Sequence, residues 1–302
     1  MIGALIVKKS KALSVIYVLF CYVVALVIGF FNFRWIDTHL SSLFWSTLIA
    51  NIITTTVVFI FSVVANNSSV YDPYWSLIPP FILMLWLHEF SFSEIPWHLF
   101  VIFSAVCLWS IRLTFNWLIN WQGMEQEDWR YVFFRNKTGK WYWIVSYSGI
   151  HLFPTFMVYL GLTPLYFVYR QINKPNILLF SIGIAVSLIG TLISLLADYS
   201  LYQHRKSNIS HLSIRRGIWK YSRHPNYLGE LTFWFSLLLI GLSYSYSFVF
   251  TGIGFIAMVV LFLAYSIPAI EKRMLKRRTD YSEIIQSVPK LLPIPSLLVK
   301  RK

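Results

Sequence analysis

The polar side chains best suited to bind a charged small molecule gather in residues 217–230 of a very apolar chain. Pro225 is a favourable first residue of a helix, which predicts that a helix begins there. Beyond it, Asn226, Gly229 and Glu230 follow at i, i+3 and i+4, so they share one helix face. A carboxylate one turn into a helix, beside an amide and a glycine that permits close approach, indicates a ligand-binding wall.

Two cations, Arg223 and His224, stand immediately before this predicted helix. Backbone N–H groups at a helix N-terminus already favour anions, and the cations strengthen that preference. A basic loop followed by a helix cap is the alternative, and it would explain Arg223 and Lys220. It leaves Glu230 unexplained, so we favour a binding site.

A second polar set follows a long apolar run: Asp198, Tyr202 and Arg205, at i, i+4 and i+7. If the helix of that run continues, the three side chains share a face at the membrane boundary. One interpretation is a structural ion pair. The other is a nucleotide site, in which Asp198 accepts hydrogen bonds from ribose hydroxyls and Arg205 binds phosphate.

A third polar pair, Arg112 and Asn116, lies four residues apart inside another apolar run. Ionisable groups within membrane spans are costly and usually face a cavity or a partner. An arginine near a helix end can instead extend its charged head to the lipid headgroups. These residues alone are compatible with both roles.

The histidines show no spacing typical of a metal site, because His151, His204 and His211 are scattered. We therefore expect no metal. The chain also lacks the glycine-rich phosphate-binding motifs of soluble nucleotide-binding folds. A nucleotide, if one binds, would be held by a different architecture.

The elements that must position these residues are membrane helices. Hydrophobic residues make up 57% of the 302-residue chain and charged residues 13%, with a mean hydropathy of +0.61. A soluble domain has about a quarter charged residues. Continuous apolar runs predict an all-α polytopic bundle of about seven or eight helices, because barrel strands show short alternating segments instead. We expect one integral membrane domain, residues 1–302.

The apolar runs predict spans near 13–31, 44–65, 77–90, 97–119, 146–169, 177–197, 226–243 and 247–269. The third is the weakest, because it is short and the Pro79-Pro80 pair makes its start irregular.

The net charge of +14 would suggest nucleic acid in a soluble protein. Here the cations cluster in the connections 120–145 and 198–225 and in the tail after Ile270. The positive-inside bias and the anionic headgroups of the lipid bilayer explain them. We expect no nucleic-acid partner and place both termini in the cytoplasm.

The order of the polar residues resembles the steroid 5α-reductase C-terminal superfamily, and in particular its bacterial-type DUF1295 branch. The resemblance rests on Asp198, Arg205, Gly217, Tyr221, the run Arg-His-Pro-Asn-Tyr-Leu-Gly-Glu at 223–230, Glu271, Tyr281 and Pro289. The segments 72–75, 112–116 and 127–131 resemble that branch as well. The resemblance therefore covers residues 70–295.

The resemblance implies a membrane-embedded reductase that uses NADPH to saturate an activated C=C bond in a hydrophobic, steroid-like or enone substrate. By position, Asp198 and Arg205 would bind the ribose and phosphates, and Arg112 the adenosine end. Ser194 stands where the eukaryotic reductases carry an asparagine, which alters the expected cofactor contacts. The full implied cofactor-binding set is Arg112, Asp198, Arg205, Tyr221, Arg223, His224, Asn226, Tyr227, Glu230 and Glu271.

The substrate half of the site is less well defined. Steroid reductases polarise the substrate ketone with a glutamate and a tyrosine, and the nearest polar candidates here are Asp72 and Tyr74. An acid of raised pKa or a phenol could hydrogen-bond the enolate that forms as hydride adds at the β-carbon. Asp-Pro-Tyr is also ordinary turn chemistry, so a structural role for Asp72 remains open.

Two other classes fit parts of the pattern. A methyltransferase of the isoprenylcysteine carboxyl methyltransferase type, using S-adenosylmethionine, is similar at Arg-His-Pro-x-Tyr. The continuation through Asn226 to Glu230, and the Asp198 and Arg205 pair, favour the reductase. A non-enzymatic membrane protein that retains the fold is the third possibility, and the presence of Arg205 and Glu230 argues against it.

Overall fold

The computed structural model describes residues 10–88, 90–91, 94–171, 174–207, 209 and 211–292. Every regular element in these ranges is a helix, which confirms the predicted all-α fold. Seven helices or continuous helical runs among them are long and apolar enough to cross a membrane. They are α2 (Lys11–His39), α3 (Leu43–Ala65), α5 (Trp97–Asn120), the run Trp129–Tyr169, α9 (Ile177–Arg205), α10 (Pro225–Tyr244) and the run Tyr246–Arg277.

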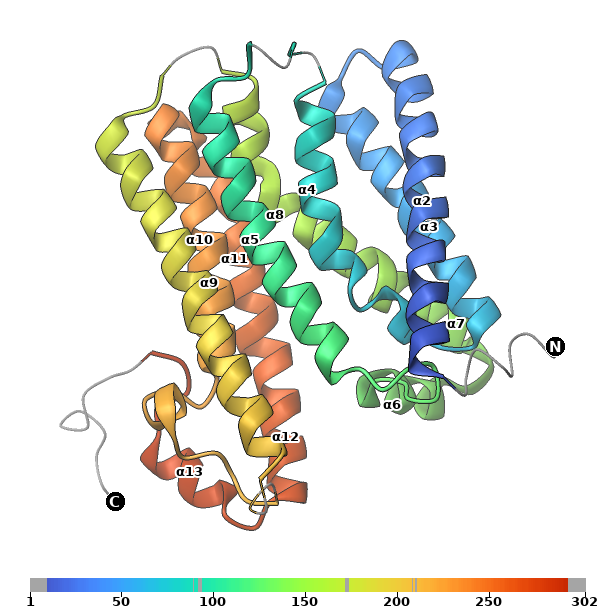
Figure 1. Ribbon diagram of the computed structural model, residues 1–302, viewed down its shortest axis with the longest axis vertical. Coiled ribbons are helices and arrows are strands. Elements are labelled where there is room, and N and C mark those ends of the chain that lie inside the picture. Colours follow the sequence, from blue (N-terminus) through green and yellow to red (C-terminus); the bar gives the residue numbers. More distant parts are fainter. Residues whose placement is uncertain are drawn as a thin grey trace. The chain divides into compact units, whose positions relative to one another are not determined.

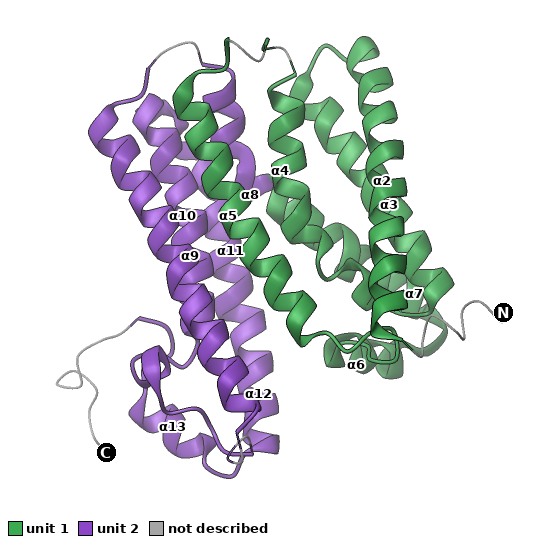
Figure 2. Cartoon of the chain, in the orientation of Figure 1, with its two compact units in different colours: residues 1–159 green, residues 160–302 purple. Residues whose placement is uncertain are grey.

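The chain forms two compact units, residues 1–159 and 160–302, and the division falls within α8 (Phe153–Tyr169) (Figure 2). The prediction of a single membrane domain stays a prediction.

In unit 1, α2 and α3 pack along each other through small residues. A Cβ atom on Gly29 would lie 2.1 Å from Oγ1 of Thr54, so only glycine allows this approach. The hydroxyl of Tyr17 donates to the carbonyl of Phe61 at 2.8 Å and joins the same two helices. Membrane helices associate through such close backbone packing and interhelical hydrogen bonds.

The third predicted span, 77–90, is not a full-length span. It falls on α4 (Tyr74–Trp86), whose 13 residues extend only about 20 Å, short of the roughly 30 Å hydrocarbon layer. The 3₁₀ turn η1 (Ser68–Tyr71) precedes it. Together they lead the chain from the C-terminal end of α3 toward the end of unit 1 where α5 begins (Figure 1).

Two of the long helical runs contain a π-helical segment. The first run joins α6 (Trp129–Thr138), η3 (Gly139–Trp141), α7 (Tyr142–Val145), the π-helix η4 (Ser146–Leu152) and α8. The second joins η6 (Tyr246–Gly252), α11 (Ile253–Val260), the π-helix η7 (Leu261–Ser266) and α12 (Ile267–Arg277), and α13 (Tyr281–Ser287) follows it. Such π-helical turns inside α-helices often occur at functional sites.

In unit 2, α9 and α10 pack backbone to backbone. A Cβ atom on Gly190 would lie 2.7 Å from the carbonyl oxygen of Gly229, and one on Gly183 would lie 2.8 Å from a side-chain carbon of Ile240. Both glycines are buried. The pair therefore forms a rigid frame for the polar residues at its Arg205 end.

Candidate functional site

The predicted helix start at Pro225 is confirmed, because α10 begins at this residue and His224 is its N-cap. The helix of the run 177–197 continues beyond its predicted end, since α9 extends to Arg205. Asp198 and Arg205 therefore share one face of α9, with Asp198 half-buried and Arg205 exposed.

Gly229 serves helix packing. A Cβ atom there would lie 2.2 Å from Oγ of Ser194 and 2.5 Å from the carbonyl oxygen of Gly190. The close neighbour that Gly229 admits is thus the α9 backbone, so its position is explained without a ligand. The hydroxyl of Ser194 donates to the carbonyl of Asn226 at 3.1 Å, which ties the first turn of α10 to α9.

Arg223, His224 and Glu271 are brought together in a buried cluster. Oε1 of Glu271 lies 2.8 Å from Nε of Arg223 and 3.0 Å from Nε2 of His224. The burial of Tyr281, with the Glu271 carboxylate nearby, raises the pKa of that phenol to about 12. The structure thus brings together residues that are distant in the sequence, and their predicted role in cofactor binding stays a prediction.

The guanidinium of Arg223 also holds the end of α13. Its Nη1 donates to the carbonyls of Ile285 and Val288, both at 2.8 Å, and its backbone N–H donates to the carbonyl of Pro289 at 2.9 Å. With its side chain only 7% exposed, Arg223 uses its donors inside the protein. These contacts make it a clamp between α10, α12 and α13.

The remaining predicted residues of α10 differ in accessibility. Glu230 is buried, whereas Asn226 and Tyr227 are half-buried. The ring of Tyr227 stacks on the His224 ring, with 5.8 Å between the ring centroids, and packs against the Phe262 ring, with 4.9 Å between the centroids.

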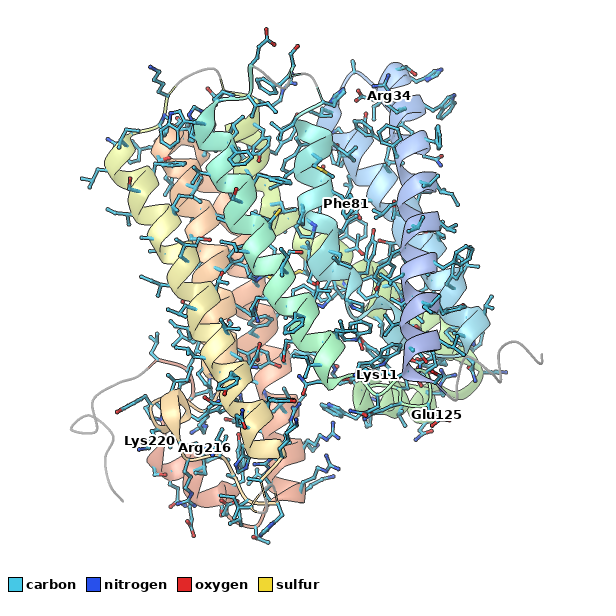
Figure 3. All side chains as sticks on the ribbon, viewed as in Figure 1. Lys11, Arg34, Phe81, Glu125, Arg216 and Lys220 are labelled. Carbon is cyan, nitrogen blue, oxygen red and sulfur yellow. The ribbon has the colours of Figure 1, made fainter. Side chains whose placement is uncertain are left out.

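The segment before α10 lies beside the end of α9, because the indole N–H of Trp219 donates to the carbonyl of Ala197 at 3.1 Å. Tyr221 is largely exposed there. Arg216 and Lys220 are exposed at the same end of unit 2 (Figure 3). With Arg205 they give this end an accessible basic surface.

Arg112 is buried within α5 and belongs to unit 1, whereas the other nine predicted cofactor residues belong to unit 2. Its predicted role at the adenosine end stays a prediction.

The two predicted catalytic residues have different partners. The phenol of Tyr74 donates to Oδ1 of Asn51 at 2.8 Å, deep inside unit 1. Asp72 instead accepts from the phenol of Tyr131 at 2.5 Å, at the turn that precedes α4. Burial and the negative charge of Asp128 raise the pKa of Asp72 to about 7.

Asn51 is the residue that the sequence analysis missed. Its side chain is 2% exposed, and among the described residues its Nδ2 has no hydrogen-bond partner. An orphaned buried amide costs about 1–3 kcal/mol, so such groups call for an explanation. The available signal was an amide in the middle of the apolar run 44–65, where polar groups usually mark a functional position.

Among the described residues, no group of three or more His, Cys, Asp or Glu side chains is placed to hold a metal ion.

The helices and their buried polar groups define a multi-pass helical membrane protein. The family described as "Protein of unknown function (DUF1295)" matches residues 58–288, and the chain belongs to this family. An uncharacterized protein of Schizosaccharomyces pombe is 26% identical over 203 residues, covering 60% of this chain and 59% of that protein. The chain thus matches less than two thirds of the length of this relative. No solved structure matches the chain.

Proposed function

We propose that the protein is a membrane-embedded, NADPH-dependent reductase of an activated C=C bond in a lipid-soluble enone. The observation that carries this proposal is the Tyr74–Asn51 pair. Its atoms are buried in the interior of unit 1, and Nδ2 of Asn51 is a donor without a partner among the described residues.

This pair is suited to a carbonyl oxygen. An unpaired N–H donor in an apolar interior favours a ligand that has a hydrogen-bond acceptor and is otherwise apolar. A ketone on a lipid-soluble molecule meets that requirement. A donor on the ketone oxygen stabilises the enolate that forms when the β-carbon is reduced, and the neighbouring phenol of Tyr74 provides a proton donor.

The cofactor half of the proposal rests on unit 2. Arg205 is an exposed residue, and Asp198 lies on the same face of α9. A guanidinium is suited to bind phosphate and a carboxylate to accept from ribose hydroxyls. The exposed Tyr221 offers an aromatic surface. These residues fit a dinucleotide, which when bound supplies the hydride.

The Arg223, His224 and Glu271 cluster has a supporting part in this proposal. Its hydrogen bonds fix the start of α10 against α12 and α13, and so they position Asn226, Tyr227 and Glu230. Preorganised polar groups bind better than mobile ones because less ordering is needed on binding.

Ligand-induced thermal stabilisation in detergent tests the cofactor assignment. We expect NADPH to raise the melting temperature, with Arg205→Ala and Glu230→Ala each abolishing the shift. Arg277→Ala is the matched control, because Arg277 is an exposed arginine at the end of α12. Glu230→Gln tests the same position with less risk to the fold, because Glu230 is buried.

A rise in melting temperature with S-adenosylmethionine but not with NADPH would overturn the reductase proposal in favour of a methyltransferase. No shift with either compound would favour a protein that retains the fold without the activity. If NADPH raises the melting temperature of Arg205→Ala and Glu230→Ala as much as that of the wild type, the cofactor residues are misassigned.

A further inference from the structure

Unit 1 contains a continuous chain of hydrogen-bonded hydroxyl groups that ends at Asn51. The phenol of Tyr71 lies 2.9 Å from Oγ1 of Thr155, and Oγ1 of Thr155 lies 2.9 Å from Oγ1 of Thr55. Oγ1 of Thr55 lies 3.4 Å from the phenol of Tyr74, which donates to Oδ1 of Asn51 at 2.8 Å. The members come from η1, α8, α3 and α4, so the tertiary fold creates the chain.

The hydroxyl of Thr155 can donate to the carbonyl of His151, which lies 2.8 Å away, or turn its proton into the chain. In the second case one arrangement of the hydroxyl protons satisfies the whole chain. Each hydroxyl has one proton to donate and lone pairs to accept with, whereas the amide oxygen only accepts. Tyr71 can therefore donate to Thr155, Thr155 to Thr55, and Thr55 to Tyr74. Tyr74 then donates to Asn51, and every hydroxyl proton points the same way.

The chain is almost completely shielded, because none of its five side chains is more than 3% exposed. Polar groups inside membrane proteins are costly and commonly mark ion or proton pathways. In such an interior, hydrogen bonds in series also polarise and strengthen one another. Five connected polar groups in an apolar core therefore point to a function for the series.

A second hydrogen-bonded chain approaches the first from a charged residue. Oε1 of Glu127 accepts from Tyr142 at 3.0 Å, and the phenol of Tyr142 lies 2.6 Å from Oγ of Ser68. Oγ of Ser68 lies 2.8 Å from Oγ of Ser146, which lies 3.5 Å from Nδ1 of His151 in the π-helix η4.

The two chains come close at Tyr71, because the His151 ring packs on the Tyr71 ring at a centroid distance of 4.8 Å. This is a ring contact, since Nδ1 of His151 lies 2.9 Å from the carbonyl oxygen of Ser146 and Nε2 lies 3.1 Å from Oγ of Ser62. Glu127 is paired with Arg135 at 3.0 Å and keeps part of its side chain exposed. The second chain thus leads from the partly exposed carboxylate of Glu127 to the imidazole ring that packs on Tyr71.

We propose that Thr55, Thr155 and Tyr71 form a proton relay that reprotonates Tyr74 after each turnover. This proposal rests on the proposed reductase function. When hydride adds to the β-carbon of the enone, the C=C electron pair becomes part of an enolate. The O–H bond of Tyr74 then breaks as its proton forms the new C–H bond at the α-carbon.

The relay restores the phenol that this step leaves deprotonated. Thr55 donates its proton to Tyr74, Thr155 donates to Thr55, and Tyr71 donates to Thr155. Tyr71 then regains one proton, which comes from solvent. In sum, the enone takes up one hydride and one solvent proton and becomes a saturated ketone, and the relay residues return unchanged.

Isosteric substitutions separate the relay from simple packing. Thr55→Val and Thr155→Val keep the side-chain shape and remove the hydroxyl, whereas Thr55→Ser and Thr155→Ser keep the hydroxyl. Thr47→Val is the matched control, because Thr47 is equally buried in α3 and its hydroxyl donates to the carbonyl of Leu43 at 2.7 Å, outside the chain.

The first measurement needs no turnover. Infrared difference spectra of protein with ring-labelled tyrosine report the phenol C–O stretch, and Tyr71→Phe and Tyr74→Phe assign the two bands. We expect Thr155→Val to shift both bands, since a broken chain changes both its ends. If Thr155→Val shifts the Tyr74 band no more than Thr47→Val does, the relay is overturned whatever the protein catalyses.

The second measurement uses NADPH with progesterone as the enone probe. We expect Thr55→Val and Thr155→Val to lower kcat by about tenfold or more, to leave KM nearly unchanged and to increase the solvent deuterium isotope effect. The serine variants should restore both values. Unchanged kcat and isotope effect in active valine variants would refute the relay while leaving the reductase intact. An inactive wild type would count against the proposed function, and the infrared result would still decide whether the chain is continuous.

Discussion

The buried cluster at the start of α10 makes a quantitative prediction about Glu271. One oxygen of this carboxylate, Oε1, accepts from Nε of Arg223 and from Nε2 of His224. Glu271→Gln keeps the size of the side chain and removes its charge. We therefore expect it to weaken the attachment of α12 to α10 without creating a cavity.

The size of the effect follows from burial. Hydrogen bonds to charged groups contribute about 1.5–3 kcal/mol each, and removing one partner of a buried ion pair costs about 3–5 kcal/mol. The Arg223 side chain is 7% exposed and that of Glu271 15% exposed, so Glu271 retains some solvent. We expect Glu271→Gln to lower the free energy of unfolding by about 2–4 kcal/mol.

Glu283→Gln is the matched control. Glu283 pairs with Arg215 at the same distance, 2.8 Å, but the two side chains are 70% and 52% exposed. Such surface pairs contribute about 0–1 kcal/mol. Unfolding in mixed detergent and sodium dodecyl sulfate micelles, followed by tryptophan fluorescence, measures both variants. Equal, small effects for the two substitutions would refute the claim that the cluster is a buried clamp.

Two further predictions use other positions. Gly229→Ala would place a Cβ 2.5 Å from the carbonyl oxygen of Gly190, and it should lower the free energy of unfolding by about 1–3 kcal/mol; Gly149→Ala, which meets nothing within 4 Å, is the control. Asp72, with its pKa raised to about 7, holds its proton longer when folded. Stability measured by thermal unfolding should therefore fall from pH 5 to 7 by up to about 3 kcal/mol and level off above it, and Asp72→Asn should lack this slope.

The fold was predictable from the sequence because membrane-spanning helices appear in it as continuous apolar runs. The boundaries at Pro225 and near Tyr244 follow from the proline and from the serines at 243, 245 and 247, both of them local signals. The span at 77–90 was marked as the weakest from its length and its proline pair, but hydropathy alone does not show that α4 ends at Trp86.

The candidate site was predictable only in part. The convergence of Arg223 and Glu271 was expected, but the carbonyls of Ile285 and Val288 that occupy Arg223 are backbone groups without a sequence signature. Gly229 looked like a ligand-facing residue, because its partner Gly190 lies on another helix.

Asn51 and the hydroxyl chain were missed for the same physical reason. Threonine and tyrosine are ordinary residues in membrane helices, and only the packing of α3, α4 and α8 connects them. Asp72 and Tyr74, although only two residues apart in the sequence, point to different partners because the chain turns between η1 and α4.

Hydride transfer from labelled cofactor tests the proposed reductase most directly. Purified protein is incubated with progesterone and NADPH carrying deuterium on the transferable C4 position, and the product is analysed by mass spectrometry and NMR. We predict a saturated ketone with one deuterium at the β-carbon and one solvent-derived hydrogen at the α-carbon, and no product with Tyr74→Phe. A product that carries no cofactor deuterium, or a methylated product formed from S-adenosylmethionine instead, would contradict this account.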